Sequence, residues 1–277
     1  NAFFVKKDLL NNKVKELNVE DGFVINKFRE SRDKNGKLMY LSKKEEEEII
    51  FSLPLTEVWL KILITGVFGF IGQNLYQNLK HKYDVKGIGR DKKITKIQKN
   101  NNLVNNIITN QNLINLNFQP DVILHCAGSG SVGKSYKNKK IDYNKNVITT
   151  KNLLKFINSL NNKPLIILFS SAAIYGNHCL KYKKKIIPIS PYGKNKLLAE
   201  NILKNKSTKK NFKLIILRFY SIYGLGLKKQ LIWDACNKIS KFKNNFFGSG
   251  KEIRSWINII DVVNLIEFIL KKKIKKN

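Results

Sequence analysis

The chain has 277 residues, 43% of them hydrophobic, which is enough to bury one large core or two small ones. Its formal net charge of +32 comes almost entirely from lysines spread along the chain. We therefore expect a solvated basic surface that attracts diphosphates, and we do not expect a specific nucleic-acid site. No apolar run reaches about 18 residues, so no membrane span is expected. The three cysteines are scattered and predict neither a disulfide framework nor a metal cluster, which fits a protein of the reducing cytoplasm.

Residues 1–60 differ in pattern from the rest of the chain. Segments 22–30 and 37–41 flank an Asn-Gly pair, which is typical of a hairpin turn. A short charged helix is predicted over 42–48, where a serine and a glutamate have the spacing of a capping box. The segment is too small for an independent core and carries no recognisable chemistry, so we interpret it as an appendage of unknown role.

From residue 61 onward, short apolar runs alternate with helical stretches. This alternation predicts an α/β fold over 61–277, with a mostly parallel sheet and helices on both of its faces. The predicted strands are 62–65, 85–89, 104–109, 122–126, 165–170 and 214–218, and the predicted helices are 71–82, 143–160 and 192–204.

A glycine-rich turn follows the first of these strands. Gly66, Gly69 and Gly72 come directly after four apolar or β-branched residues and open a helical stretch. Glycines at this spacing permit a tight turn, close approach of a pyrophosphate, and close packing of the helix on the strand. The free N–H groups of the helix N-terminus would then face the phosphates. The segment therefore predicts a dinucleotide site.

Tyr192 and Lys196 lie four residues apart in a predicted helix, about twenty residues after a Ser170-Ser171 pair. Positions i and i+4 share one helix face, so the phenol and the ammonium are expected to point at the same spot. A nearby ammonium favours the phenolate, so we expect Lys196 to lower the pKa of Tyr192 towards working pH. A tyrosine tuned in this way serves as a general base or acid.

The ordered motifs resemble one known family. The glycine turn at 66–72, the segments 121–128 and 170–176, and the Tyr192/Lys196 pair together resemble the extended short-chain dehydrogenase/reductase family, within it the NAD-dependent nucleotide-sugar epimerase/dehydratase group. The resemblance implies a Rossmann-type doubly wound parallel sheet over 61–277 with a partial substrate-binding subdomain from about residue 219, and it implies that the catalytic residues are Ser171, Tyr192 and Lys196. No metal site is expected. The resemblance also implies cofactor contacts from Gly66, Gly69, Phe70, Ile71, Gly72, Arg90, Ala127, Gly128, Asn146, Tyr192 and Lys196, and substrate contacts from Ser129, Ser171, Ser221 and Arg254.

Cofactor choice is read at the end of the second strand, where an acidic residue would accept the adenosine ribose hydroxyls. That position holds Gly89, and the next residue, Arg90, would pair with a 2′-phosphate. Asp91 would still reach a ribose if the strand ended one or two residues later. The run therefore leans to NADP and leaves NAD open. His125 is expected to be a packed strand residue rather than a catalyst.

Two alanines argue against one of the family's reactions, the elimination of water. Dehydratases of the family place Asp and Glu directly after the catalytic hydroxyl residue, where this chain has Ala172 and Ala173, which carry no protons. The resemblance then implies an NAD(P)-dependent nucleotide-sugar 4-epimerase that oxidises and re-reduces sugar C4, in cell-surface polysaccharide biosynthesis. The alternatives are a nucleotide-4-keto-sugar reductase and, in another class, an inactive Rossmann scaffold that binds a partner such as RNA.

Two expectations concern the rest of the molecule. The resemblance implies a nucleotide-diphosphate sugar as partner, with no membrane contact, and a homodimer formed through the helix around 143–160. Relatives generally continue for several tens of residues beyond the helix that follows Asp261, so we expect a truncated substrate-binding part and weak or absent activity.

Overall fold

The computed structural model places its described residues in two compact units, Asn1–Val58 and Trp59–Asn277. In the first unit, β1 (Ser31–Arg32) pairs antiparallel with β2 (Leu38–Met39). The predicted hairpin arm at 22–30 and the helix at 42–48 lie outside the described residues. The structure describes residues 31–32, 38–39, 59–90, 102–178, 186–210, 212–243, 245–246 and 253–274.

The second unit is built on a parallel six-stranded sheet with the order β5-β4-β3-β6-β7-β8. The chain starts in the middle of the sheet at β3, runs outward to β5, returns to β6 beside β3, and continues to β8. This is the strand order of a doubly wound Rossmann fold, in which ligands bind where the direction of winding reverses. The strands are β3 (Lys61–Thr65), β4 (Asp84–Gly89), β5 (Leu103–Asn105), β6 (Val122–His125), β7 (Leu165–Ser171) and β8 (Leu214–Phe219).

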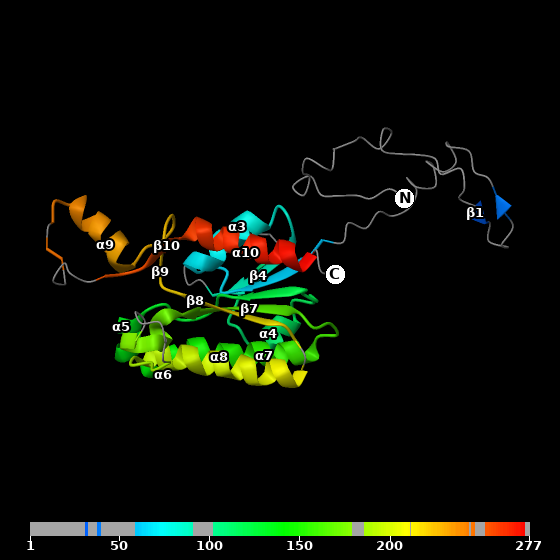
Figure 1. Cartoon of the computed structure of the whole chain (residues 1–277), viewed down its shortest axis with the longest axis horizontal. Coiled ribbons are helices and arrows are strands. Elements are labelled where there is room, and N and C mark those ends of the chain that lie inside the picture. The colour runs from blue at the N-terminus through cyan, green and yellow to red at the C-terminus, as the bar shows by residue number, and fades with distance from the viewer. Residues whose placement is uncertain are drawn as a thin grey trace. The chain divides into compact units, whose positions relative to one another are not determined.

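One face of the sheet packs against α3 (Phe70–Leu79) and α10 (Ile259–Ile274), which Figure 1 shows on the same side of the sheet. Ile62 and Ile64 of β3 point into this layer because alternate residues of a strand share a face. They are fully buried and pack with the apolar faces of both helices, formed by Leu75, Tyr76, Leu79, Val262, Val263, Ile266 and Leu270.

The opposite face packs against α7 (Thr149–Ser159) and α8 (Pro191–Lys210), which lie on the other side of the sheet in Figure 1. Leu63 of β3 and Ile123 of β6 point into this layer, out of phase with the isoleucines of the first. The apolar residues contributed by the helices are Leu153, Leu154, Phe156, Ile157 and Leu203. Burial on both faces explains why the strands read as continuous apolar runs in the sequence.

Shorter elements complete the unit. After β8, β9 (Ser221–Tyr223) pairs in parallel with β10 (Trp256–Asn258), and α9 (Gln230–Ile239) lies between them in the sequence. No helix within the described ranges is long and apolar enough to cross a membrane. The remaining elements are α4 (Asn110–Ile114), α5 (Val132–Lys137), α6 (Lys139–Tyr143), the π-helical turn η2 (Asn144–Ile148) and the 3₁₀ segment η3 (Ala172–His178).

Two predicted elements differ from the structure. The strand predicted over 104–109 is too long, because β5 ends at Asn105, and Thr109 instead caps α4 by accepting a hydrogen bond from the Asn112 N–H. The helix predicted over 143–160 is not continuous α-helix, because η2 occupies its first turn. Such π-turns insert one residue into a helix and are frequent at functional sites. Here the turn contains the buried Asn146.

Candidate active site

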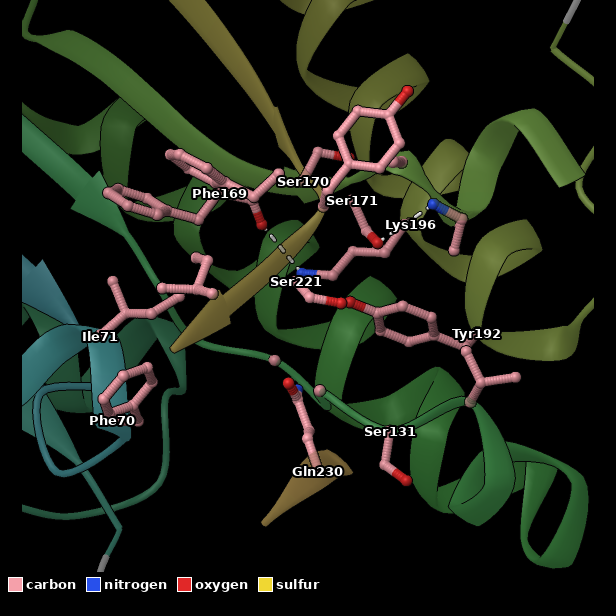
Figure 2. A pocket seen from close by; sticks show the side chains of 18 of the residues that line it. Phe70, Ile71, Ser131, Phe169, Ser170, Ser171, Tyr192, Lys196, Ser221 and Gln230 are labelled. Atoms are coloured by element: carbon pink, nitrogen blue, oxygen red, sulfur yellow. Dashed lines mark hydrogen bonds between the residues drawn. The ribbon is translucent and has the colours of Figure 1, made fainter. Parts of the chain in front are cut away.

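A cavity of about 650 Å³ opens at the carboxyl ends of the central strands, where the strand order reverses. Figure 2 shows side chains from several distant segments of the chain directed into it. The lining comes from the glycine turn, the loop after β6, the end of β7, the start of α8, and the segments around β9 and β10. Of the predicted site residues it includes Gly66, Gly69, Phe70, Ile71, Gly72, Gly128, Ser129, Ser171, Tyr192, Lys196, Ser221 and Arg254.

The glycine turn forms one wall of this cavity. Gly66 has a φ of +75°, and a Cβ there would lie 2.7 Å from the Ala127 Cα. A Cβ on Gly72 would overlap the Gly66 carbonyl oxygen. Gly69 precedes α3 without a side-chain cap, and the first turn of α3 has no acidic residue. The turn therefore leaves backbone N–H groups and a favourable helix dipole for a phosphate-bearing ligand, which fits the predicted dinucleotide.

The opposite wall carries the predicted catalytic residues, which the fold does bring together. Lys196 is buried, its Nζ donates to the Phe169 carbonyl oxygen at 2.9 Å, and it lies 6.0 Å from the centre of the Tyr192 ring. Ser171 at the end of β7 accepts a hydrogen bond from the Ala173 N–H at 3.2 Å. Figure 2 shows the Tyr192 hydroxyl and the Lys196 ammonium directed into the same part of the cavity.

The predicted effect of Lys196 on Tyr192 is wrong for this geometry. Burial raises the pKa of Tyr192, and the negative charge of Asp142 raises it further, while a hydrogen bond with Ser171 acts in the opposite direction. Burial also lowers the pKa of Lys196 to about 8, against the influence of Cys126, Asp142 and Glu200. The ammonium is thus directed to a strand carbonyl, and loss of solvent dominates the pKa of the phenol.

Asn146 lies just outside the cavity lining and forms two hydrogen bonds there. Its Oδ1 accepts from the Ser129 N–H at 3.3 Å, and its Nδ2 donates to the Asp142 carbonyl oxygen at 3.0 Å. A Cβ on Gly128 would lie 2.7 Å from the Asn146 Oδ1 and 3.1 Å from the Lys196 Nζ. The β6 loop therefore fits against both side chains only because residue 128 is glycine. Asn146 does not itself line the cavity.

Two further predicted contacts lie away from the cavity lining. Ala127 is buried beneath the glycine turn, where its backbone contacts Gly66. Arg90 directly follows β4 and is exposed. Asp91, the competing determinant of cofactor choice, lies outside the described residues.

His125 is a packed strand residue, as the sequence predicted. Its ring nitrogens lie 2.7 Å from the Thr65 Oγ1 and 3.1 Å from the Thr150 Oγ1, and the side chain is buried. Burial, followed by the charge of Lys196, lowers the pKa of His125 to about 3. The neutral imidazole therefore bridges β3, β6 and α7.

Sequence reasoning missed an ionic network next to Ser171, the predicted catalytic serine. The Glu200 carboxylate accepts from Ser170 Oγ at 2.6 Å and from Arg218 Nη2 at 2.7 Å. Arg218 also donates to the Tyr175 hydroxyl at 2.8 Å. Glu200 follows Lys196 by four residues on α8, so their shared helix face was a signal in the sequence. The network ties the ends of β7 and β8 to α8.

The segments after β8 add the last wall. Pairing of β9 with β10 sets Ser221 opposite Trp256, and Arg254 enters the cavity lining from an exposed position just before β10. Lys229 and Gln230 also line the cavity, and sequence reasoning did not single them out.

Comparison with known proteins agrees with this arrangement. The NAD dependent epimerase/dehydratase family matches residues 62–277. This chain belongs to that family. The family consists of enzymes, and its description as NAD dependent agrees with a glycine turn shaped for a dinucleotide.

Individual relatives divide between related reactions. The chain is 30% identical over 220 residues to a putative UDP-glucose 4-epimerase of Methanocaldococcus jannaschii, covering 73% of this chain and 70% of the relative. It is 27% identical over 222 residues to a GDP-6-deoxy-D-talose 4-dehydrogenase of Aggregatibacter actinomycetemcomitans, covering 78% and 72%. A crystal structure of UDP-glucuronic acid 4-epimerase from Bacillus cereus, with UDP-glucuronic acid and NAD, is 25% identical with a TM-score of 0.64, covering 73% and 70%.

Proposed function

We propose that this chain is an NAD(P)-dependent nucleotide-sugar 4-epimerase, which oxidises the sugar transiently at C4 and reduces it again on the other face. The observation that carries the proposal is the meeting of Ser171, Tyr192 and Lys196 on one wall of a cavity whose other wall is the glycine turn. A proton-transfer group and a dinucleotide cradle then share one space of about 650 Å³, large enough for cofactor and substrate ends to meet.

The side chains have distinct tasks in this reaction. A bound nicotinamide supplies the acceptor and donor of the C4 hydride. Tyr192 takes the proton of the C4 hydroxyl and returns it, and its hydrogen bond with Ser171 favours the ionised phenol. Lys196, whose Nζ lies 6.0 Å from the centre of the Tyr192 ring, would hold the nicotinamide ribose.

The two alanines after Ser171 support oxidation without elimination. Ala172 and Ala173 both line the cavity, so the positions nearest the catalytic serine offer methyl groups where an elimination of water requires proton carriers. A 4-keto-sugar reductase or 4-dehydrogenase uses the same side chains, and the similarity to the GDP-6-deoxy-D-talose 4-dehydrogenase favours it as the second candidate. The two differ in cofactor use, because an epimerase regenerates its cofactor in each cycle.

The nucleotide-diphosphate sugar and the type of cofactor complete the proposal. Arg254 enters the cavity as a bidentate donor suited to a diphosphate. Exposed Arg90 after β4 favours NADP, whose additional phosphate it would bind. We place the reaction in cell-surface polysaccharide biosynthesis, a role that genetic deletion followed by analysis of surface sugars would test.

A panel of UDP-, GDP- and dTDP-sugars, each incubated with the protein without added cofactor, tests the function. We expect C4-inverted product from at least one sugar. Turnover only when NAD(P) or NAD(P)H is added in stoichiometric amounts would favour the oxidoreductase, and absence of conversion under both conditions would contradict both.

We further propose a homodimer formed through the helices around 143–160. The elements α6, η2, α7 and α8 pack against one another, and Ile141, Tyr143 and Leu198 on them are exposed apolar side chains. Light scattering coupled to size-exclusion chromatography should give twice the 32.0 kDa chain mass, and Leu198→Lys should shift it towards the monomer. A monomeric wild type at micromolar concentration would contradict this interface.

A further inference from the structure

Lys229 holds an unusual place in the cavity. It lines the same space as Tyr192, and its Nζ lies 3.1 Å from where a Cβ on Gly130 would stand, so the ammonium rests on the loop after β6. The next residue, Gln230, has a φ of +73° and also lines the cavity. Figure 2 shows its amide directed inward. A non-glycine residue in this left-handed region is strained, and such strain is typical of functional sites.

The charged side chains that line the cavity with Lys229 are all positive. Among the described residues that line the cavity, the charged side chains are Lys196, Lys229 and Arg254, with no aspartate or glutamate. Burial lowers the pKa of Lys229, and the positive charges of Lys134 on α5 and Lys145 on η2 lower it further. In the described part of the chain no salt bridge to Lys229 is recorded. Lys229 keeps part of its surface exposed to solvent, and an anionic ligand in the cavity would relieve this repulsion.

The position of Lys229 indicates which part of a substrate would meet it. The loop after β6 places Gly128 against the Lys196 Nζ and, two residues later, Gly130 against the Lys229 Nζ. Lys229 is therefore next to the loop that also borders the catalytic residues. In a nucleotide sugar bound with C4 at Tyr192, the closest carbon that can carry a carboxylate is C6, which is attached to C5 beside C4. The diphosphate lies on the other side of the sugar, at C1.

We propose that Lys229 binds a carboxylate on the sugar ring, so that this chain acts on nucleotide-hexuronic acids in preference to neutral nucleotide hexoses. The inference rests on the proposed function, because it places sugar C4 at Tyr192. Lys229 supplies a charge-assisted hydrogen bond to the C6 carboxylate, and the Gln230 amide, which is also directed into the cavity (Figure 2), is a second donor. Lys134 and Lys145 add positive potential without entering the cavity lining.

UDP-glucuronate and UDP-glucose test this inference, since they differ only at C6. Binding of each should be measured by calorimetry, and C4 inversion by chromatography, for the wild type, Lys229→Met and the control Lys228→Met. Lys228 is the adjacent lysine, exposed like Lys229, but it does not line the cavity. We expect the wild type to bind UDP-glucuronate at least tenfold more tightly than UDP-glucose. Lys229→Met should lose about tenfold to a hundredfold for UDP-glucuronate and less than threefold for UDP-glucose, and Lys228→Met should match the wild type.

The outcomes separate this inference from the proposed function. Retained UDP-glucose binding in Lys229→Met would show that the variant is folded. Equal losses for both ligands would assign Lys229 to the diphosphate and overturn the inference, as would equal binding of both, or no binding of either, by the wild type. Selective binding of UDP-glucuronate without C4 inversion would sustain the role of Lys229 and contradict the epimerase.

Discussion

Replacement of Lys196 by methionine should stabilise the protein while it abolishes catalysis. Burial lowers the pKa of Lys196 from 10.5 to about 8, which at about 1.36 kcal/mol per pKa unit corresponds to a cost of about 3 kcal/mol for keeping the charged form folded at pH 7. Methionine has a similar length and no charge to desolvate. Loss of the hydrogen bond to the Phe169 carbonyl oxygen offsets about 1 kcal/mol of the gain. The expected net increase in the free energy of unfolding is about 2 kcal/mol, or about 5 °C in Tm.

The difference in unfolding free energy between Lys196→Met and the wild type should depend on pH. Between pH values of about 8 and 10.5 the native state binds fewer protons at Lys196 than the unfolded state, so rising pH stabilises the wild type relative to the variant. Urea unfolding should therefore show the full gain of about 2 kcal/mol below pH 8 and a shrinking gain above it. Above about pH 10.5 only the loss of the hydrogen bond remains, so the variant should be about 1 kcal/mol less stable than the wild type. Exposed Lys194 on the same helix supplies the control, Lys194→Met, with a change below about 0.5 kcal/mol. A Lys196→Met variant no more stable than the wild type at pH 7, or a difference independent of pH, would refute the reasoning.

Three further substitutions test other parts of the molecule. Tyr192→Phe should reduce kcat at least a thousandfold and leave cofactor binding within about threefold, because only the proton carrier is lost; unchanged turnover would exclude the assigned role. Gly72→Ala would press a Cβ against the Gly66 carbonyl and should lower stability by about 2 kcal/mol and cofactor affinity by at least tenfold, measured by thermal melts and cofactor titration. Glu200→Gln should cost about 2 kcal/mol at pH 7 by leaving partly exposed Arg218 unpaired. Because the pKa of Glu200 is lowered from 4.5, that difference should disappear as the pH falls well below 4.5; a difference that persists in acid would point to packing instead.

Much of the fold was predictable because its signals are local. The apolar run before Gly66, the glycine spacing and the helix after it lie within a dozen residues, and each element forms where the sequence predicts it. The error at β5 has a local cause as well. Ile107 extends the apolar run but is half exposed, and Thr109 caps α4, so side-chain capping ends the strand that hydrophobicity alone would continue.

The sequence predicted which residues form the site, but it did not predict the direction in which the pKa values of Tyr192 and Lys196 change. The spacing of Tyr192 and Lys196 set both side chains on one face of α8, but only the three-dimensional structure shows how deeply each is buried, and burial decides the direction of both pKa changes. Lys229 lies well away in the sequence from the β6 loop that it contacts. A contact of that kind depends on how separate segments pack, and no periodicity or spacing in the sequence encodes it.

The fate of the C4 hydrogen tests the proposed function most directly. The nucleotide sugar that the panel identifies as substrate should be prepared with deuterium at C4 and incubated with the protein without added cofactor, and the product analysed by mass spectrometry and NMR. The account predicts C4-inverted product that keeps its deuterium at C4, because the hydride leaves and returns within one enzyme-bound cycle. Loss of the deuterium from C4, or a 4-keto sugar as the released product, would contradict it.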